Sequence, residues 1–227
     1  ALFSYKFAGL SEDGLPMVYN ENGEATVGDV NFQETENLMD FLEFEGPGEP
    51  TWNGSIGNTF RYDFGKGGKL DLNVYVTFSG GNKVRLDPVF SAAYSDLSSM
   101  PREYKNRWMV AGDEKVTNIP VIASYNQYDR YGGTTLSTAY SAYNYSSARI
   151  PKGDFIRLKE VSLSYDFPKN IVEKMRLGSL SLKVQATNLC LLYADKKLNG
   201  QDPEFFNTGG VAVPLPKQFT FTLKIGL

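Results

Sequence analysis

The sequence predicts an all-β protein whose antiparallel strands belong to a transmembrane β-barrel. Apolar and polar residues alternate in six segments, as in strands with one apolar and one polar face. The connections between these segments alternate between short turns and long loops, which is typical of the two ends of an outer-membrane barrel. No run approaches the roughly 20 apolar residues of a membrane-spanning helix, but a barrel strand needs only about 9–11 residues.

The first three expected strands lie within the first 79 residues, at 2–9, 54–64 and 69–79. The first is short, and the other two alternate regularly, apart from Asn58 in an otherwise apolar row. Gly65-Lys66-Gly67-Gly68 joins the second strand to the third. A glycine-rich link of this length predicts a tight hairpin.

The other three expected strands lie at 155–167, 179–193 and 217–227. The alternation in the first of them changes phase at Lys159–Glu160, which predicts a β-bulge. The link Pro168–Gly178 has room for one helical turn. The last strand alternates most regularly, and either Phe219 or Phe221 is expected near an aromatic girdle at the membrane interface.

Three connections are long, at roughly 10–53, 80–154 and 194–216. Structureless links of this length are unusual in a compact soluble domain, but they suit the external loops of a barrel. The short turns then lie on the periplasmic side, and the final strand runs toward it. One helix is expected within the middle connection, near 96–109.

Composition and charge exclude several functions. The formal net charge is −3 and the isoelectric point is about 5.2, so we expect no nucleic-acid partner. The chain has no histidine and only one cysteine, Cys190, which removes His-based catalysis, His or Cys metal clusters and internal disulfides. We therefore expect no catalytic residues, no metal site and no cofactor. The chain also opens without a signal-peptide pattern.

Several short motifs occur in the order found in one protein family. They are SYKFAGLSEDGLPMVYNENG at 4–23, PTWNGSIGNTFRYDF at 50–64, the NRW, AGD and IP elements within 106–120, FIRLKEVSLSYDFPKNIVEKM at 155–175, SLSLKVQATNLCLLYAD at 179–195, QDPE at 201–204, PLPK at 214–217 and FTFTLKIGL at 219–227. Together they resemble the C-terminal barrel portion of SusC/RagA-family TonB-dependent outer-membrane transporters.

The resemblance implies a barrel of about 22 strands, of which this chain supplies about the last six. It implies import of glycans or peptides through the bacterial outer membrane, with an SusD-like surface lipoprotein as partner. The other implied partners are membrane lipid, the rest of the barrel, the plug and TonB, which acts through an N-terminal part that this sequence lacks. Neither a plug domain nor an enzymatic activity is expected in residues 1–227.

Two groups of residues are candidates for functional contacts. Aromatic rings suit sugars, peptides or a protein partner, and those expected to touch substrate or partner are Tyr94, Tyr104, Trp108, Tyr125, Tyr128 and Tyr131. The residues expected to face the barrel lumen are Arg61, Asp63, Lys183 and Gln185. The alternative roles are loop-on-loop packing for the aromatics and simple solvation or ion pairing for the polar residues.

Two other classes of protein remain open. A soluble carbohydrate-binding β-sandwich would bury the same alternating faces in a core. A glycoside hydrolase fragment would need two carboxylates across a cleft, and the proximity of Asp202 and Glu204 in sequence is no sign of that arrangement.

Overall fold

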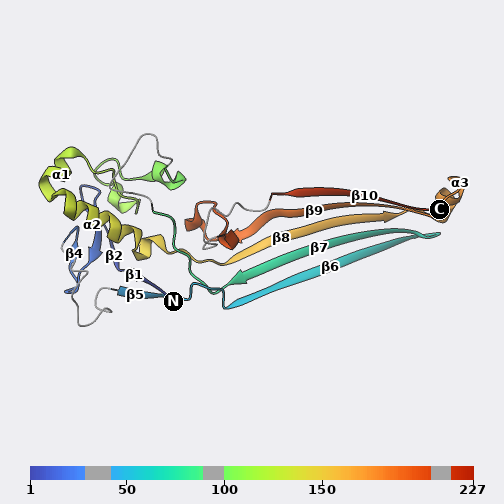
Figure 1. Ribbon diagram of the computed structural model, residues 1–227, viewed down its shortest axis with the longest axis horizontal. Coiled ribbons are helices and arrows are strands. Elements are labelled where there is room, and N and C mark those ends of the chain that lie inside the picture. The colour runs from blue at the N-terminus through green and yellow to red at the C-terminus, as the bar shows by residue number, and fades with distance from the viewer. Residues whose placement is uncertain (29–41, 89–99, 206–215) are drawn as a thin grey trace. The chain divides into compact units, whose positions relative to one another are not determined.

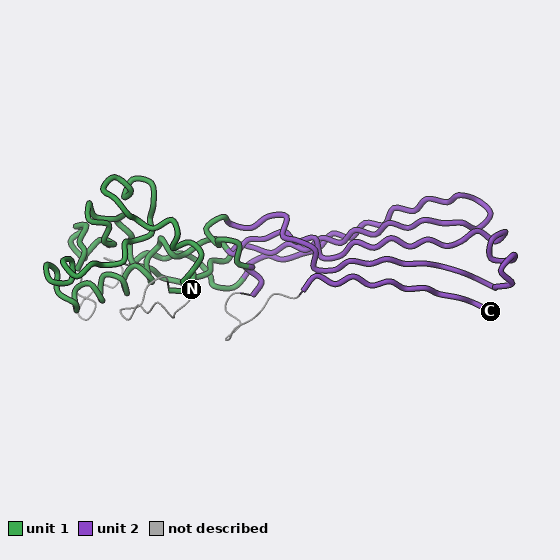
Figure 2. The backbone as a smooth tube through the Cα atoms, turned by 90° about the horizontal axis from the view of Figure 1, so that it is seen from above, with its two compact units in different colours: residues 1–49, 82–152, 196–201 green, residues 50–81, 153–195, 202–227 purple. Residues whose placement is uncertain are grey.

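The computed structural model describes residues 1–28, 42–88, 100–205 and 216–227, and the statements below concern these residues (Figure 1). The chain divides into two compact units (Figure 2). Unit 1 combines residues 1–49, 82–152 and 196–201, and unit 2 combines residues 50–81, 153–195 and 202–227. Each of the three long connections therefore contributes to unit 1, which is a folded body.

Unit 2 is a five-stranded antiparallel sheet in which every strand pairs with its neighbour in sequence. Its strands are β6 (Trp52–Gly65), β7 (Gly68–Gly80), β8 (Phe155–Asp166), β9 (Ser179–Ala194) and β10 (Gln218–Gly226). They lie where the alternating pattern predicted five of the six strands. The sheet order is β10-β9-β8-β7-β6, so β6 and β10 are open edges and the described residues form no closed barrel.

The two tight connections also form as expected. Gly65 pairs with Gly68, which leaves Lys66 and Gly67 as a two-residue loop with φ of 52° and 84°. Positive φ at both positions is the type I′ geometry that matches the twist of a hairpin. The second connection carries the short helix α3 (Lys169–Lys174).

The predicted bulge in β8 is confirmed at Lys159. Tyr75 of β7 pairs with Glu160, whereas the following Val76 pairs with Leu158, so Lys159 is the extra residue. Because the bulge inserts one residue, it shifts the alternation of side chains by one position. Leu158 consequently lies on the same face of the sheet as the apolar residues on the other side of the bulge.

The register gives unit 2 one apolar and one polar face. From the hairpin end, three successive rows across the apolar face are Tyr62, Leu70, Tyr165, Leu182 and Leu223; Phe60, Leu72, Leu163, Val184 and Phe221; and Asn58, Val74, Val161, Ala186 and Phe219. This face is half-buried to exposed, and the ring of Phe221 is 74% exposed. Phe221 lies in the second of these rows and Phe219 in the third.

The described residues of unit 1 form two small sheets and two α-helices. Strands β1 (Leu2–Tyr5) and β5 (Leu42–Gly46) form one sheet, and β2 (Phe7–Leu10), β3 (Pro16–Tyr19) and β4 (Ala25–Thr26) form the other. The helices are α1 (Tyr125–Tyr131) and α2 (Gly133–Asn144). Short 3-10 helices cover Arg102–Asn106, Asp113–Lys115, Ser147–Arg149, Lys196–Leu198 and Pro203–Phe205, the last of them in unit 2.

The structure differs from the sequence prediction at 2–9. This segment is divided into β1 and β2, which join different sheets of unit 1, and neither joins the five-stranded sheet. The division occurs where the chain is held by residues 145–147: the amide of Tyr5 donates to the carbonyl of Tyr145, and the amide of Phe7 donates to Ser147 Oγ. Alternation alone could not distinguish these contacts from pairing in a long strand.

The structure also differs from the prediction of a helix near 96–109. Residues 96–99 lie outside the described residues, and the described part forms only the 3-10 helix Arg102–Asn106. Instead, α1 and α2 are the α-helices in the described part of this connection. No helix in the described residues is long and apolar enough to cross a membrane.

Candidate functional site

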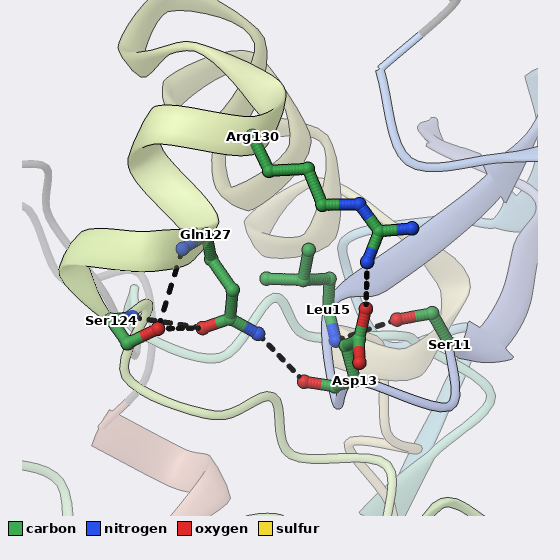
Figure 3. Close-up of polar contacts among 6 residues, drawn as sticks. All are labelled: Ser11, Asp13, Leu15, Ser124, Gln127 and Arg130. Carbon is green, nitrogen blue, oxygen red and sulfur yellow. Dashed lines mark hydrogen bonds and ion pairs between the residues drawn. The ribbon is translucent and has the colours of Figure 1, made fainter.

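Helix α1 carries three of the aromatic residues singled out by the sequence, and polar contacts fix it to the turn 11–15 (Figure 3). Ser124 and Gln127 form a capping box at its start. Gln127 Nε2 then donates to the carbonyl of Asp13 at 2.9 Å, and Arg130 Nη1 lies 3.1 Å from Asp13 Oδ2. The helix therefore presents its side chains in a defined orientation.

The three α1 tyrosines have different environments. Tyr125 is 84% exposed and has its ring available to a ligand or partner. Tyr128 and Tyr131 are partly buried and pack against a core formed by Leu15, Leu136 and Tyr140. Tyr125 is thus the α1 tyrosine that can offer most of its ring surface, while the other two anchor the helix.

An open depression of about 550 Å³ lies beside Tyr131 in unit 1. It is lined by Ser11, Met17, Ala25, Thr26, Val27, Gly28, Tyr131 and Thr135. The lining combines hydroxyl groups with apolar side chains and carries no charge. Such a surface can hydrogen-bond neutral groups and pack against apolar ones.

Tyr104 belongs to the core. It is 3% exposed and packs with Tyr143 against Phe7, Ile119 and other partly buried residues. Burial leaves it no surface for substrate or partner, so the contact role predicted for Tyr104 does not fit this structure. Tyr94, predicted with it, lies outside the described residues.

Trp108 anchors a turn. Its Nε1 donates to Glu114 Oε2 at 3.1 Å, and its ring lies against the backbone of Gly14. Glu114 also accepts from the amide of Gly112 at 2.8 Å. Hydrogen bonds from backbone amides, including its own, and from Trp108 lower the pKa of the Glu114 carboxyl.

The tip of this turn carries exposed apolar residues that sequence analysis did not single out. Met109, Val110 and Val116 are all well exposed. The amides of Met109 and Val110 both donate to Asp113 Oδ2 at 3.0 Å, which orders the tip. The available signal was the sequence Met-Val-Ala-Gly-Asp at 109–113, because adjacent apolar residues in a polar turn indicate a contact surface.

The four residues predicted to face a lumen lie on the polar face of unit 2. Arg61 and Lys183 belong to one row, while Gln185 and Asp63 belong to the rows on either side of it. Arg61 forms a bidentate pair with Asp71 of the next strand, with Nε–Oδ1 and Nη2–Oδ2 distances of 2.7 and 2.8 Å. Asp63 instead accepts from the amide of Gly65 at 2.7 Å and so stabilises the hairpin.

The sequence also did not reveal the role of Arg157 on this polar face. Arg157 is buried, and its Nη2 lies 2.5 Å from both carboxylate oxygens of Asp202. Its Nε lies 3.0 Å from Glu204 Oε2, and Lys159 Nζ lies 3.9 Å from the other oxygen of Glu204. The two acids considered for hydrolysis thus fasten the segment 202–205 to β8. Partners so distant in sequence give no local signal.

Among the described residues, no cluster of three or more His, Cys, Asp or Glu side chains could hold a metal ion. Catalysis by paired carboxylates has no support either, because Asp202 and Glu204 are both engaged by Arg157.

Comparison with known proteins gives a likeness in fold alone. No protein-family model matches the sequence, and no curated protein matches it. Among solved structures, the chain is similar to a chain of the RagAB peptide importer in an open-open state, with 17% identity and a TM-score of 0.63 over 99% of this chain. It is also similar to the RagAB peptide importer in a closed-closed state, with 19% identity and a TM-score of 0.60 over 98% of this chain.

A third similar structure, of the RagAB peptide transporter, has 18% identity and a TM-score of 0.54 over 89% of this chain. The chain spans only about a fifth of the length of these proteins, 20–22%. The likeness to the two importer structures extends over nearly the whole chain and hence over both units.

Proposed function

We propose that this chain forms part of the wall and external loops of an outer-membrane importer. Unit 2 is the wall, with its apolar face toward lipid and its polar face toward the lumen. Unit 1 is the folded external loop region. In this proposal the chain performs no covalent chemistry, and the remaining strands, the plug and the coupling to TonB belong to other parts of the protein.

The exposed apolar face of unit 2 carries this proposal. In a soluble protein a face of this extent would be covered by a second layer, whereas lipid covers it in a membrane. Along β8, the apolar band runs from Ile156 to Phe167, the residue just after the strand. For strands tilted by about 40° to the membrane normal, this length corresponds to a height of about 25 Å. This is close to the apolar band of about 25 Å in outer-membrane barrels.

Aromatic residues at both ends of the band give further support. At the hairpin end, Tyr62 lies against Phe64 and Tyr165 lies against Phe167, each with ring centroids 4.8 Å apart. At the other end, Trp52 lies 6.1 Å from Phe78. Aromatic girdles at both interfaces are typical of membrane barrels.

The cargo and partner follow from the exposed surfaces of unit 1. We propose peptides or glycans as cargo, and the likeness to peptide importers favours peptides. An SusD-like lipoprotein is the proposed partner, and Tyr125 and the tip formed by Met109, Val110 and Val116 are the surfaces on which it would rest.

Arginine substitutions on the two faces of the sheet test the proposed wall. Val74→Arg and Phe221→Arg place a charge in the middle rows of the apolar face, at a cost of about 2–4 kcal/mol each at the bilayer midplane. We expect both variants of the full protein to be depleted from the outer-membrane fraction and to lose the heat-modifiable gel mobility of folded barrels.

Their matched controls are Asn73→Arg and Thr222→Arg, which lie one residue away on the polar face. These controls should assemble normally. Equal assembly of all four variants would refute a lipid-facing role for the apolar face.

A soluble carbohydrate-binding β-sandwich is less well supported. A sandwich needs a second sheet packed on the apolar face at a spacing of about 10 Å. Within the described residues, unit 2 has a single sheet.

A further inference from the structure

The hairpin end of unit 2 combines two turn segments, 66–67 and 168–178, the second of which contains α3 (Figure 1). The amide of Lys169 donates to the carbonyl of Lys66 at 3.0 Å, which joins the two segments. Gly68 alternates with Leu70 and so points to the apolar face, where a side chain would collide with Pro168. The second turn segment therefore begins against the apolar face itself.

These turn segments carry an excess of positive charge in a protein of negative net charge. Lys66, Lys169, Lys174 and Arg176 are all exposed, and Glu173 is the single carboxylate among them. None of the four cations has an ion-pair partner in the described part of the chain. The nearby Asp63 and Asp166 lie with Lys69 and Lys224 in a row of the polar face.

Two of these cations occupy backbone positions that other residues fill more easily. Four described non-glycine residues have positive φ: Lys66, Arg176, Asn188 and Asn199. Asparagine tolerates this region, whereas Lys and Arg at such positions are strained relative to glycine. Both basic exceptions therefore lie in the turns at this one end of the sheet.

Arg176 in particular stands where helices usually place glycine. The amide of Leu177 donates to the carbonyl of Val172, and the amide of Arg176 donates to that of Glu173. These two bonds define a Schellman motif, in which glycine is the usual residue at the left-handed position. The backbone of this position thus favours glycine, and Arg176 instead keeps a positive charge there.

Helix α3 also exposes apolar residues beside these charges. Ile171 and Met175 are 39% and 55% exposed and lie four residues apart, hence on the same side of the helix. Val172 is buried and anchors the helix. Aromatic residues end the apolar band of the sheet at this same end, namely Tyr62, Phe64, Tyr165 and Phe167.

We propose that this end of the sheet binds the headgroups of anionic phospholipids in the adjoining leaflet. The proposal rests on the function proposed above, because it requires the apolar face to contact lipid. Lys66, Lys169, Lys174 and Arg176 engage the phosphate groups. Ile171 and Met175 enter the boundary between headgroups and acyl chains, as in amphipathic helices that lie in a membrane interface.

The test replaces two of the cations by residues that their backbone positions prefer. Lys66→Asn and Arg176→Gly, combined in the full protein, remove two charges and relieve both strained positions. The matched control, Lys105→Asn with Lys115→Asn, removes two exposed charges from unit 1. Native mass spectrometry of the detergent-solubilised proteins then measures bound phosphatidylglycerol against phosphatidylcholine of the same chain length.

We expect the parent protein and the control to prefer phosphatidylglycerol. The Lys66→Asn, Arg176→Gly variant should lose this preference by about thirtyfold, since each of the two basic residues near an anionic membrane surface contributes about 1 kcal/mol. Its thermal unfolding temperature should be unchanged or higher. A merely structural role of the two residues would instead lower that temperature or leave lipid selectivity unchanged.

Three outcomes would overturn the inference: no lipid preference in the parent protein, an unaltered preference in the variant, or displacement of the lipid by inorganic phosphate at equal concentration. Membrane fractionation separates this failure from failure of the proposed function. Normal outer-membrane assembly without lipid selectivity would reject only the headgroup site, whereas absence of the parent protein from the outer membrane would reject the proposed function.

Discussion

Trp108 shows how one side chain orders a long connection. Its ring covers Gly14 while its indole nitrogen is bound by Glu114. The sequence motif drew attention to this residue, but its partners lie on opposite sides of it in the chain, and the approach to Gly14 crosses more than ninety residues of sequence. A motif can therefore mark such a residue without revealing whether it binds a ligand or holds the fold.

Gly14→Ala tests this packing contact. Gly14 has φ of 75°, and a methyl group there would collide with the Trp108 ring. We expect backbone strain of about 1–2 kcal/mol, and overpacking adds about 1–3 kcal/mol. Hydrogen exchange of the Val121 amide, which donates to the Gly14 carbonyl, measures the loss as local opening.

Gly23→Ala is the control, because Gly23 has φ of 76° and open space around the position of a Cβ atom. It should show the strain without the collision. Local opening is again measured by hydrogen exchange, in the turn that contains each glycine. Equal increases in opening for Gly14→Ala and Gly23→Ala would argue against the Trp108 contact.

The Glu114 carboxyl predicts a pH dependence in the same turn. Its pKa in the folded protein lies below the ordinary value of 4.5, so its hydrogen bonds stabilise the turn above that pH and are lost as the pH falls through the folded-state pKa. Fluorescence of Trp108, measured in a Trp52→Phe background, should therefore change reversibly on acidification below about pH 4.5.

Glu114→Gln should remove this transition, because the amide keeps an acceptor oxygen but does not titrate in this range. An identical acid transition in the Glu114→Gln variant would assign the change to another group.

At the scale of elements, the long strands were predictable because, in a strand with one apolar and one polar face, the polarity of each residue indicates the face on which it lies. The bulge at Lys159 was predictable for the same reason, since an inserted residue reverses the alternation. Helices α1 and α2 were missed because Gly132 and Gly133 interrupt them, and because Thr and Tyr have weak helix propensity. Their stability comes from packing around Tyr140, which the local sequence does not show.

The ion pairs on the polar face of unit 2 differ in burial, and we expect them to differ in energetic weight. Arg157→Met should destabilise the protein by about 3–5 kcal/mol, because it leaves the buried Asp202 carboxylate unpaired. Arg61→Met breaks a bidentate but exposed pair and should cost less than about 1 kcal/mol. Thermal unfolding of the full protein in detergent measures both changes.

The double variant Arg157→Met, Asp202→Leu should recover part of the loss, since no unpaired charge remains. Equal effects of Arg157→Met and Arg61→Met would contradict the burial of the Arg157 pair.

At the scale of the whole molecule, unit 2 has an exposed apolar face and two open edges, both of which favour association. We expect residues 1–227 alone to aggregate in plain buffer and to disperse in detergent, as measured by analytical ultracentrifugation. Replacing Ile56, Phe60, Phe221 and Leu223 by threonine should reduce this aggregation, because it makes the exposed face polar. A monodisperse monomer of the unaltered chain in plain buffer would contradict this expectation.

The division into two units has a consequence for the order of folding. The hairpins β6–β7 and β8–β9 join strands that are close in sequence, and such local contacts form quickly. Unit 1 instead joins distant stretches, as when Glu103 binds both Arg149 and Asn199. Because these two hairpins lie between the stretches of unit 1, each hairpin is expected to pair before unit 1 closes. Unit 1 would then be completed late in folding. The time at which it becomes protected from protease during refolding would mark the latest point at which the two hairpins pair.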